Sequence, residues 1–97
     1  MEKRSNRYTL DLALSAYADG STTPEKKLQL SFTNHDELFS IIQLIAEKNI
    51  FEEPQQSTEF AIGLKLFTEV MLKNRNHPIF EELAPAIATF MKKLKST

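Results

Sequence analysis

Two histidines and several carboxylates are the side chains here with the chemistry to hold a metal ion or move a proton. His35, Asp36 and Glu37 are consecutive. Side chains that meet on a helix are three or four residues apart, so these three do not converge on one ion. Asn34 and Glu37 instead match a capping box, and both acids suit the positive end of a helix dipole. We therefore expect a capped helix start rather than a metal site.

The second histidine, His77, precedes Pro78 in a predicted loop. With His35 and either Glu81 or Glu82 it would supply metal ligands, but catalytic zinc needs three converging protein ligands and an open position. Nothing in the spacing predicts convergence, so we expect a surface or capping histidine. Acids become catalytic where burial or a neighbour shifts their pKa, which the sequence does not indicate. We predict no catalytic, cofactor-binding or metal-binding residue; the other acids considered are Glu52, Glu53, Glu59 and Glu69.

Nucleophile and nucleotide motifs are missing from the sequence. No serine lies in a Gly-x-Ser-x-Gly elbow, and the only glycines, Gly20 and Gly63, are too far apart for a phosphate-binding loop. The chain has no cysteine, which removes thiolate chemistry and fits a reducing compartment. No apolar run approaches the ~20 residues of a membrane span. We expect a cytoplasmic protein that does not enter a membrane.

The charge balance disfavours nucleic-acid binding. The formal net charge is -1 and the pI is about 6.1, whereas affinity for phosphates depends on a basic surface. Weak nucleic-acid binding remains an alternative if the two ends of the chain meet, with Tyr8 stacking on a base. The basic patch would then consist of Lys3, Arg4, Arg7, Lys92, Lys93 and Lys95.

The first predicted element is an antiparallel β-hairpin at about residues 7–33. Apolar residues alternate with polar or small ones from Tyr8 to Ala16 and again from Leu28 to Phe32. A period of two is typical of a half-buried strand. Turn-forming residues at 19–24 separate the two runs, which is the pattern of a hairpin.

Helices are expected in the rest of the chain, because apolar residues recur there at three- and four-residue steps. The fold class is therefore α+β in the order ββααα, a hairpin packed against about three helices. Its length suits a single domain over residues 1–97. The predicted helices cover about residues 35–49, 54–75 and 78–95.

Four residues mark the predicted helix boundaries and irregularities. Asn49 is a left-handed helix stop, and Pro54 suits a first helical turn. Pro85 indicates either one kinked helix or a short turn followed by a second helix. Gly63 costs about 1 kcal/mol relative to alanine in a helix interior. We expect close approach by another element to compensate at Gly63.

The run FAIGLKLFTEVMLKNR at 60–75 resembles an uncharacterised bacterial family, domain of unknown function 3861. The segments NHDELFSI at 34–41, PIF at 78–80 and FMKKLK at 90–95 are also similar to it. The resemblance implies a bacterial origin, one compact domain and a hairpin followed by helices. It brings no activity, cofactor or catalytic residue to this chain.

The function expected from these observations is that of a small protein-interaction or regulatory module without catalysis. Two strands alone are marginal in water, and their outer edges are open to hydrogen bonding. The first strand carries only Asp11 as an interior charge against edge pairing. We expect a protein partner, most simply a second copy that pairs through a strand edge about a two-fold axis.

An enzyme or small-ligand-binding protein is the alternative function. Its pocket would lie between the hairpin and the helices and would be apolar. Aromatic residues at helical spacing are more often part of the core than of a pocket. The residues considered for that lining are Phe39, Phe67, Phe80 and Phe90.

Overall fold

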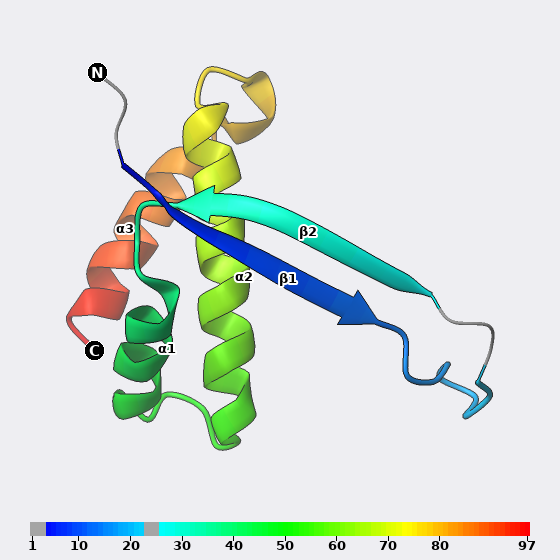
Figure 1. The fold of residues 1–97 in the computed structure, drawn as a ribbon. Coiled ribbons are helices and arrows are strands. Elements are labelled where there is room, and N and C mark those ends of the chain that lie inside the picture. Colours follow the sequence, from blue (N-terminus) through cyan, green and yellow to red (C-terminus); the bar gives the residue numbers. More distant parts are fainter. Residues whose placement is uncertain (1–3, 23–25) are drawn as a thin grey trace. The chain divides into compact units, whose positions relative to one another are not determined.

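Two strands precede three α-helices in the computed structural model, which describes residues 4–22 and 26–97 (Figure 1). This confirms the predicted ββααα order. The chain divides into two compact units, one ending at Asp36 and the other running from Glu37 to Thr97. The single domain and the packing of hairpin on helices stay predictions. The elements are β1 (Asn6–Ala13), β2 (Lys27–Asn34), α1 (Leu38–Glu47), α2 (Pro54–Lys73), the 3-10 helix η1 (Pro78–Phe80) and α3 (Leu83–Lys95).

The hairpin pairs β1 with β2 in an antiparallel register from Asn6 opposite Asn34 to Ala13 opposite Lys27. The sequence alternation continues to Ala16, but the strand stops at Ala13. Directly opposite residues share a face of the sheet, so the register fixes which side chains lie together.

The segment beyond β1 closes on itself by backbone hydrogen bonds. The amide of Tyr17 donates to the carbonyl of Ser21 at 2.8 Å, and the amide of Gly20 donates to Tyr17 at 2.9 Å. Gly20 has a φ of 90°, a left-handed conformation that glycine adopts without steric cost. The predicted turn residues Thr23 and Pro24 lie outside the described residues.

Helix α1 begins later than predicted, and a different residue caps it. Glu37 is the N-cap, and its Oε2 accepts a hydrogen bond from the amide of Phe39 at 2.7 Å. Asn34 instead accepts a hydrogen bond from the amide of Asp36 at 2.9 Å, which turns the chain before the helix. The predicted capping role of Asn34 is therefore wrong. Asn49 has a φ of 53°, so the predicted left-handed stop is confirmed.

The prolines mark helix starts. Pro54 opens α2, as predicted. The chain then breaks into η1 before α3 begins at Leu83, and Pro85 occupies the first turn of α3. A proline in a first turn loses no helical hydrogen bond. The alternative of a short turn followed by a second helix is confirmed, and the break lies before Pro85 rather than at it.

The helical unit has its own core, with one deeply buried residue from each helix. Ile45 of α1, Ala61 of α2 and Leu94 of α3 are 4%, 1% and 8% exposed. Gly63 lies away from this core, because a Cβ at Gly63 would meet no described neighbour within 4 Å beyond its own helical turn. The predicted close approach at Gly63 is wrong. Half-buried side chains surround the core: Ile41, Ile42, Phe51, Phe60, Leu64 and Met91.

Candidate protein-interaction site

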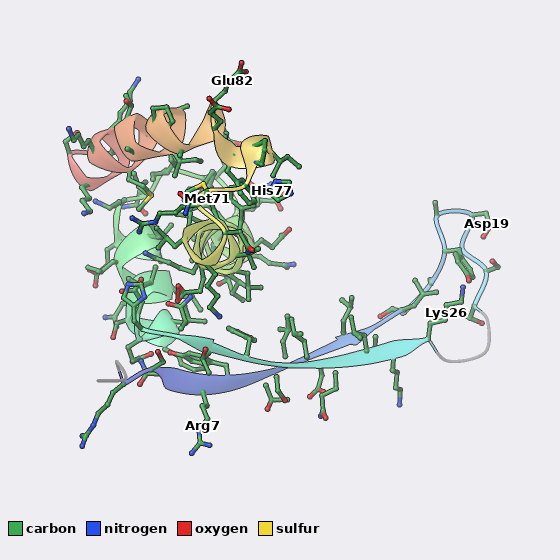
Figure 2. All side chains as sticks on the ribbon, turned by 90° about the horizontal axis from the view of Figure 1, so that it is seen from above. Arg7, Asp19, Lys26, Met71, His77 and Glu82 are labelled. Carbon is green, nitrogen blue, oxygen red and sulfur yellow. The ribbon has the colours of Figure 1, made fainter. Side chains whose placement is uncertain are left out.

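The hairpin has one apolar and one polar face. Side chains leave the ribbon on two opposite sides in Figure 2. Near its base, the rings of Tyr8 and Phe32 stack with centroids 5.3 Å apart. Towards its tip, Leu12 and Leu28 are 62% and 59% exposed. We call the aliphatic part of the apolar face the leucine face; it consists of Leu10, Leu12, Leu14, Leu28 and Leu30.

The base of the hairpin is fastened at one backbone oxygen. The carbonyl of Asp36 accepts a hydrogen bond from the Tyr8 hydroxyl at 2.8 Å and another from Asn6 Nδ2 at 3.2 Å. Asn34, at the end of β2, is only 1% exposed. These contacts fix the base, while the leucines towards the tip stay open to solvent.

The outer edge of β1 presents the amides of alternate residues. The amide of Leu14 donates to the carbonyl of Lys26 at 3.0 Å, so this pair is hydrogen bonded. Hydrogen-bonded and non-hydrogen-bonded pairs alternate in an antiparallel ladder. The amides of Arg7, Thr9 and Asp11 therefore point away from β2. Among the described residues the sheet has only two strands, so no third strand meets this edge.

Opposite charges flank the centre of this edge. Arg7 and Asp11 are exposed, lie on the polar face and stand symmetrically about Thr9. Asp11 also accepts a hydrogen bond from Gln29 Nε2 at 3.0 Å. Figure 2 shows Arg7 extending from the sheet. From the sequence, Asp11 is expected only to discourage edge pairing; the signal that points to its second role is the opposite charge of Arg7, four residues away.

The histidines are held by local contacts. His35 Nε2 lies 3.7 Å from Asp36 Oδ1, and the two side chains are 56% and 28% exposed. His77 Nδ1 accepts a hydrogen bond from the amide of Ile79 at 3.1 Å, so the predicted capping role is confirmed. Within residues 4–22 and 26–97, no three His, Cys, Asp or Glu side chains gather as metal ligands.

Asp19 has a clear local reason for a pKa shift. Its Oδ1 accepts hydrogen bonds from the hydroxyl of Ser21 at 2.7 Å and from the amide of Ser21 at 2.9 Å. These bonds stabilise the ionised form and lower the pKa of Asp19 below its ordinary 3.8. Because the carboxylate is fully exposed and its donors belong to one loop residue, the shift reflects loop structure rather than catalysis.

The aromatic residues considered for a pocket lie in separate surroundings. Phe67 meets Phe80 edge-on with ring centroids 6.3 Å apart, and Phe90 meets Phe60 at 6.2 Å. Phe39 is 71% exposed. The first two contacts pack helices together, as aromatic residues at helical spacing usually do.

The basic patch formed by the two ends of the chain stays a prediction. Lys3 lies outside the described residues, and Arg4 and Arg7 belong to a different unit from the lysines of α3. Across the described ranges, none of the helices is long and apolar enough to cross a bilayer.

Comparison with known proteins places the chain in a family. The family model described as "Domain of Unknown Function with solved-structure structure (DUF3861)" matches residues 6–96. A crystal structure of a protein of unknown function from Pectobacterium atrosepticum is similar, with 32% identity and a TM-score of 0.82. The match covers 97% of this chain and 100% of that one. A search of curated proteins found no match.

Proposed function

Since the chain belongs to the family domain of unknown function 3861, which assigns it no activity, we propose a function from its own surfaces. It is a small protein-interaction module, not an enzyme, and it assembles through the outer edge of β1 with a second copy of itself. The observation that carries this proposal is the placement of Arg7 and Asp11 about Thr9 on an edge that no described strand covers.

A two-fold axis at Thr9 makes this edge complementary to itself. Antiparallel pairing about that axis sets Thr9 opposite the second copy's Thr9. It also sets Arg7 opposite the second copy's Asp11, and the reverse pair forms on the other side of the axis. All three residues point their amides outward, so these positions form the hydrogen-bonded pairs of the new ladder. The interface is isologous, as a two-fold dimer requires.

The apolar face gains contacts in the same register. Tyr8 then lies opposite the second copy's Leu10 at a non-hydrogen-bonded pair, where side chains approach most closely. Such cross-strand pairs contribute roughly 0.2–1 kcal/mol each. The assembled sheet has four strands, which removes the marginal stability of a two-stranded ribbon.

The outer edge of β2 is less suited to self-pairing. By the same alternation it presents Lys27, Gln29, Ser31 and Thr33. Only Lys27 is charged, so no two-fold register on β2 places opposite charges across the axis. The net charge of -1 over the whole chain also favours a protein partner over a nucleic acid.

A bacterial origin and a cytoplasmic location are part of the proposal. The similar protein of known structure comes from a bacterium. The absence of cysteine suits a reducing compartment.

Sedimentation velocity at micromolar concentration tests the interface. We expect a species of about twice the 11.1 kDa chain mass, as two-fold dimerisation requires. Thr9→Pro removes an outward amide at the centre of the interface and should give a monomer. Ser31→Pro is the matched control, because Ser31 lies directly opposite Thr9 and its amide points to the other edge. This control should stay dimeric.

A charge exchange tests the register. Arg7→Asp alone, and Asp11→Arg alone, place like charges opposite each other and should raise the dissociation constant about tenfold. The double exchange R7D/D11R restores opposite charges and should restore dimerisation. An unmodified protein that sediments only at 11.1 kDa contradicts the proposal. A double variant as weak as either single variant contradicts the register.

A further inference from the structure

A small apolar cavity opens on the helical unit between α1, α2 and α3. Its volume is about 200 Å³. Aliphatic side chains from all three helices line it, including Ile41, Leu44, Leu64 and Met91. Leu44 is 54% exposed, so the cavity is open to solvent and is not an internal void.

Three lysines surround this cavity, one at the end of α1, one in the middle of α2 and one at the end of α3. They are Lys48, Lys65 and Lys95, and none of the described side chains that line the cavity is acidic. Lys48 Nζ donates a hydrogen bond to the backbone oxygen of Thr97 at 3.2 Å, which holds this ammonium group near the end of α3. Lys48 and Lys95 also suit the negative ends of helix dipoles. Lys65 lies in the middle of α2, one helical turn before Glu69, and adds a third cation to the rim.

We propose that this lysine-rimmed cavity docks an acidic amphipathic helix of a partner protein. One large apolar side chain of that helix fills the cavity, and its flanking carboxylates meet the three lysines. An amphipathic helix laid against an apolar groove is a common mode of peptide recognition. The proposal does not depend on the β1 interface, because every residue of the cavity belongs to the helical unit.

The cavity size favours a side chain over a whole small molecule. Sites that enclose small ligands measure about 300–1,000 Å³, and this cavity is smaller and open on one side. A larger partner needs to insert only one anchor residue and spreads its other contacts over the rim.

The charge of the rim also decides which partner fits. The hairpin of a second copy carries exposed leucines, but Lys26 and Lys27 lie beside Leu28 at its tip. These lysines would meet the lysines of the rim, and like charges facing one another oppose binding. An acidic helix has the complementary charge.

Selection from a displayed peptide library tests the partner chemistry without imposing it. The library holds 16-residue helices with Leu, Ile, Phe or Met at the i, i+3, i+4 and i+7 positions and random residues elsewhere. Selection against the full-length protein should enrich Asp and Glu at the random positions. Binding of the enriched peptide is then measured by fluorescence anisotropy at two salt concentrations and should weaken at the higher one.

Two variants with equal net charge identify the surface. K48Q/K65Q/K95Q removes the rim charges, and K73Q/K92Q/K93Q removes three lysines of α2 and α3 that do not line the cavity. The rim variant should weaken binding about tenfold, and the control variant less than about threefold. Leu44→Ala should by itself weaken peptide binding, whereas Leu72→Ala, at a similarly exposed position on α2, should leave binding unchanged.

Four results overturn the proposal. They are a selection that yields no binder, enriched peptides no more acidic than the starting library, equal losses in the two lysine variants, and equal losses in the two leucine variants. Competition with decanoate gives a further check. Saturable binding of decanoate at the same lysines, with no acidic peptide selected, would assign the cavity to small amphiphiles instead.

Discussion

The hairpin and the helical unit bury their apolar side chains to very different extents. The helical unit places Ile45, Ala61 and Leu94 in a shared core, where each is less than 9% exposed. The hairpin leaves Leu12 and Leu28 more than half exposed. The helices therefore stabilise one another by burial, whereas the contacts within the hairpin are its backbone ladder, its ring stack and the hydrogen bonds at its base. This difference supports the proposal that the hairpin is the part that contacts a partner.

Truncation of one aliphatic residue in each unit tests this contrast most strongly. Ile45→Ala should lower the free energy of unfolding by about 2–5 kcal/mol, because it leaves a cavity in the core. Leu28→Ala should change it by less than about 0.5 kcal/mol, because that side chain is 59% exposed. Urea unfolding followed by circular dichroism measures both. Equal losses would show that the leucine face is covered, and the contrast would fail.

Replacement of Gly63 by alanine should raise the stability of the helical unit. Gly63→Ala should stabilise α2 by about 1 kcal/mol, because alanine favours the helix and its methyl group meets no described neighbour. The midpoint of thermal unfolding should rise by roughly 4–8 °C for a unit of this size. Gly20→Ala is a useful contrast. Gly20 has a φ of 90°, so alanine at this position should destabilise the protein. A lower midpoint for Gly63→Ala would show that another part of the protein packs against Gly63.

The fastening at Asp36 should account for part of the local stability of the hairpin. Tyr8→Phe keeps the ring stack on Phe32 but removes the hydroxyl that donates to the Asp36 carbonyl. We expect a loss of about 1 kcal/mol, seen as roughly fivefold faster amide exchange at Leu10 and Leu30.

Asn6→Ala removes the donor of the other hydrogen bond to the Asp36 carbonyl. The loss of stability should be larger in the Tyr8→Phe background than alone, because the same oxygen then loses the hydrogen bonds from both Tyr8 and Asn6. Strict additivity of the two losses would show that the two bonds act independently.

The smallest effect is expected at the loop acid. The lowered pKa of Asp19 means that its ionised form stabilises the folded loop. That contribution is complete above the unfolded pKa and is lost as the pH falls through the lower folded pKa, so only the acid range below about 3.8 is affected. Carbon-detected NMR titration should give Asp19 a pKa below 3.8. Ser21→Ala should move it back towards that value, and an unchanged pKa would contradict the assigned donor.

Features set by local residue order were accessible from the sequence. The alternation from Tyr8 to Ala16 predicted β1, although the strand ends at Ala13, and Asn49 and Pro54 marked the end of α1 and the start of α2. Competition between neighbours was harder to predict. Asn34 and Glu37 both have capping side chains, and only the turn at Asp36 decides that Glu37 caps the helix.

Features set by tertiary packing were not accessible. Lys48, Lys65 and Lys95 are far apart in the chain, and only the packing of three helices gathers them around one cavity. Their spacing in the sequence does not indicate that they share a rim. The open surroundings of Gly63 likewise depend on which face of α2 its neighbours cover.

The near-absence of charge along the free side of β2 has a consequence for how large an assembly can grow. If two chains join through β1, both margins of the combined sheet belong to β2, and each meets solvent with one lysine and three neutral polar residues. Lysine at a sheet margin discourages further strands, and no reciprocal charge invites them. Growth of the proposed assembly should therefore stop at two chains, and open-ended filaments should not form.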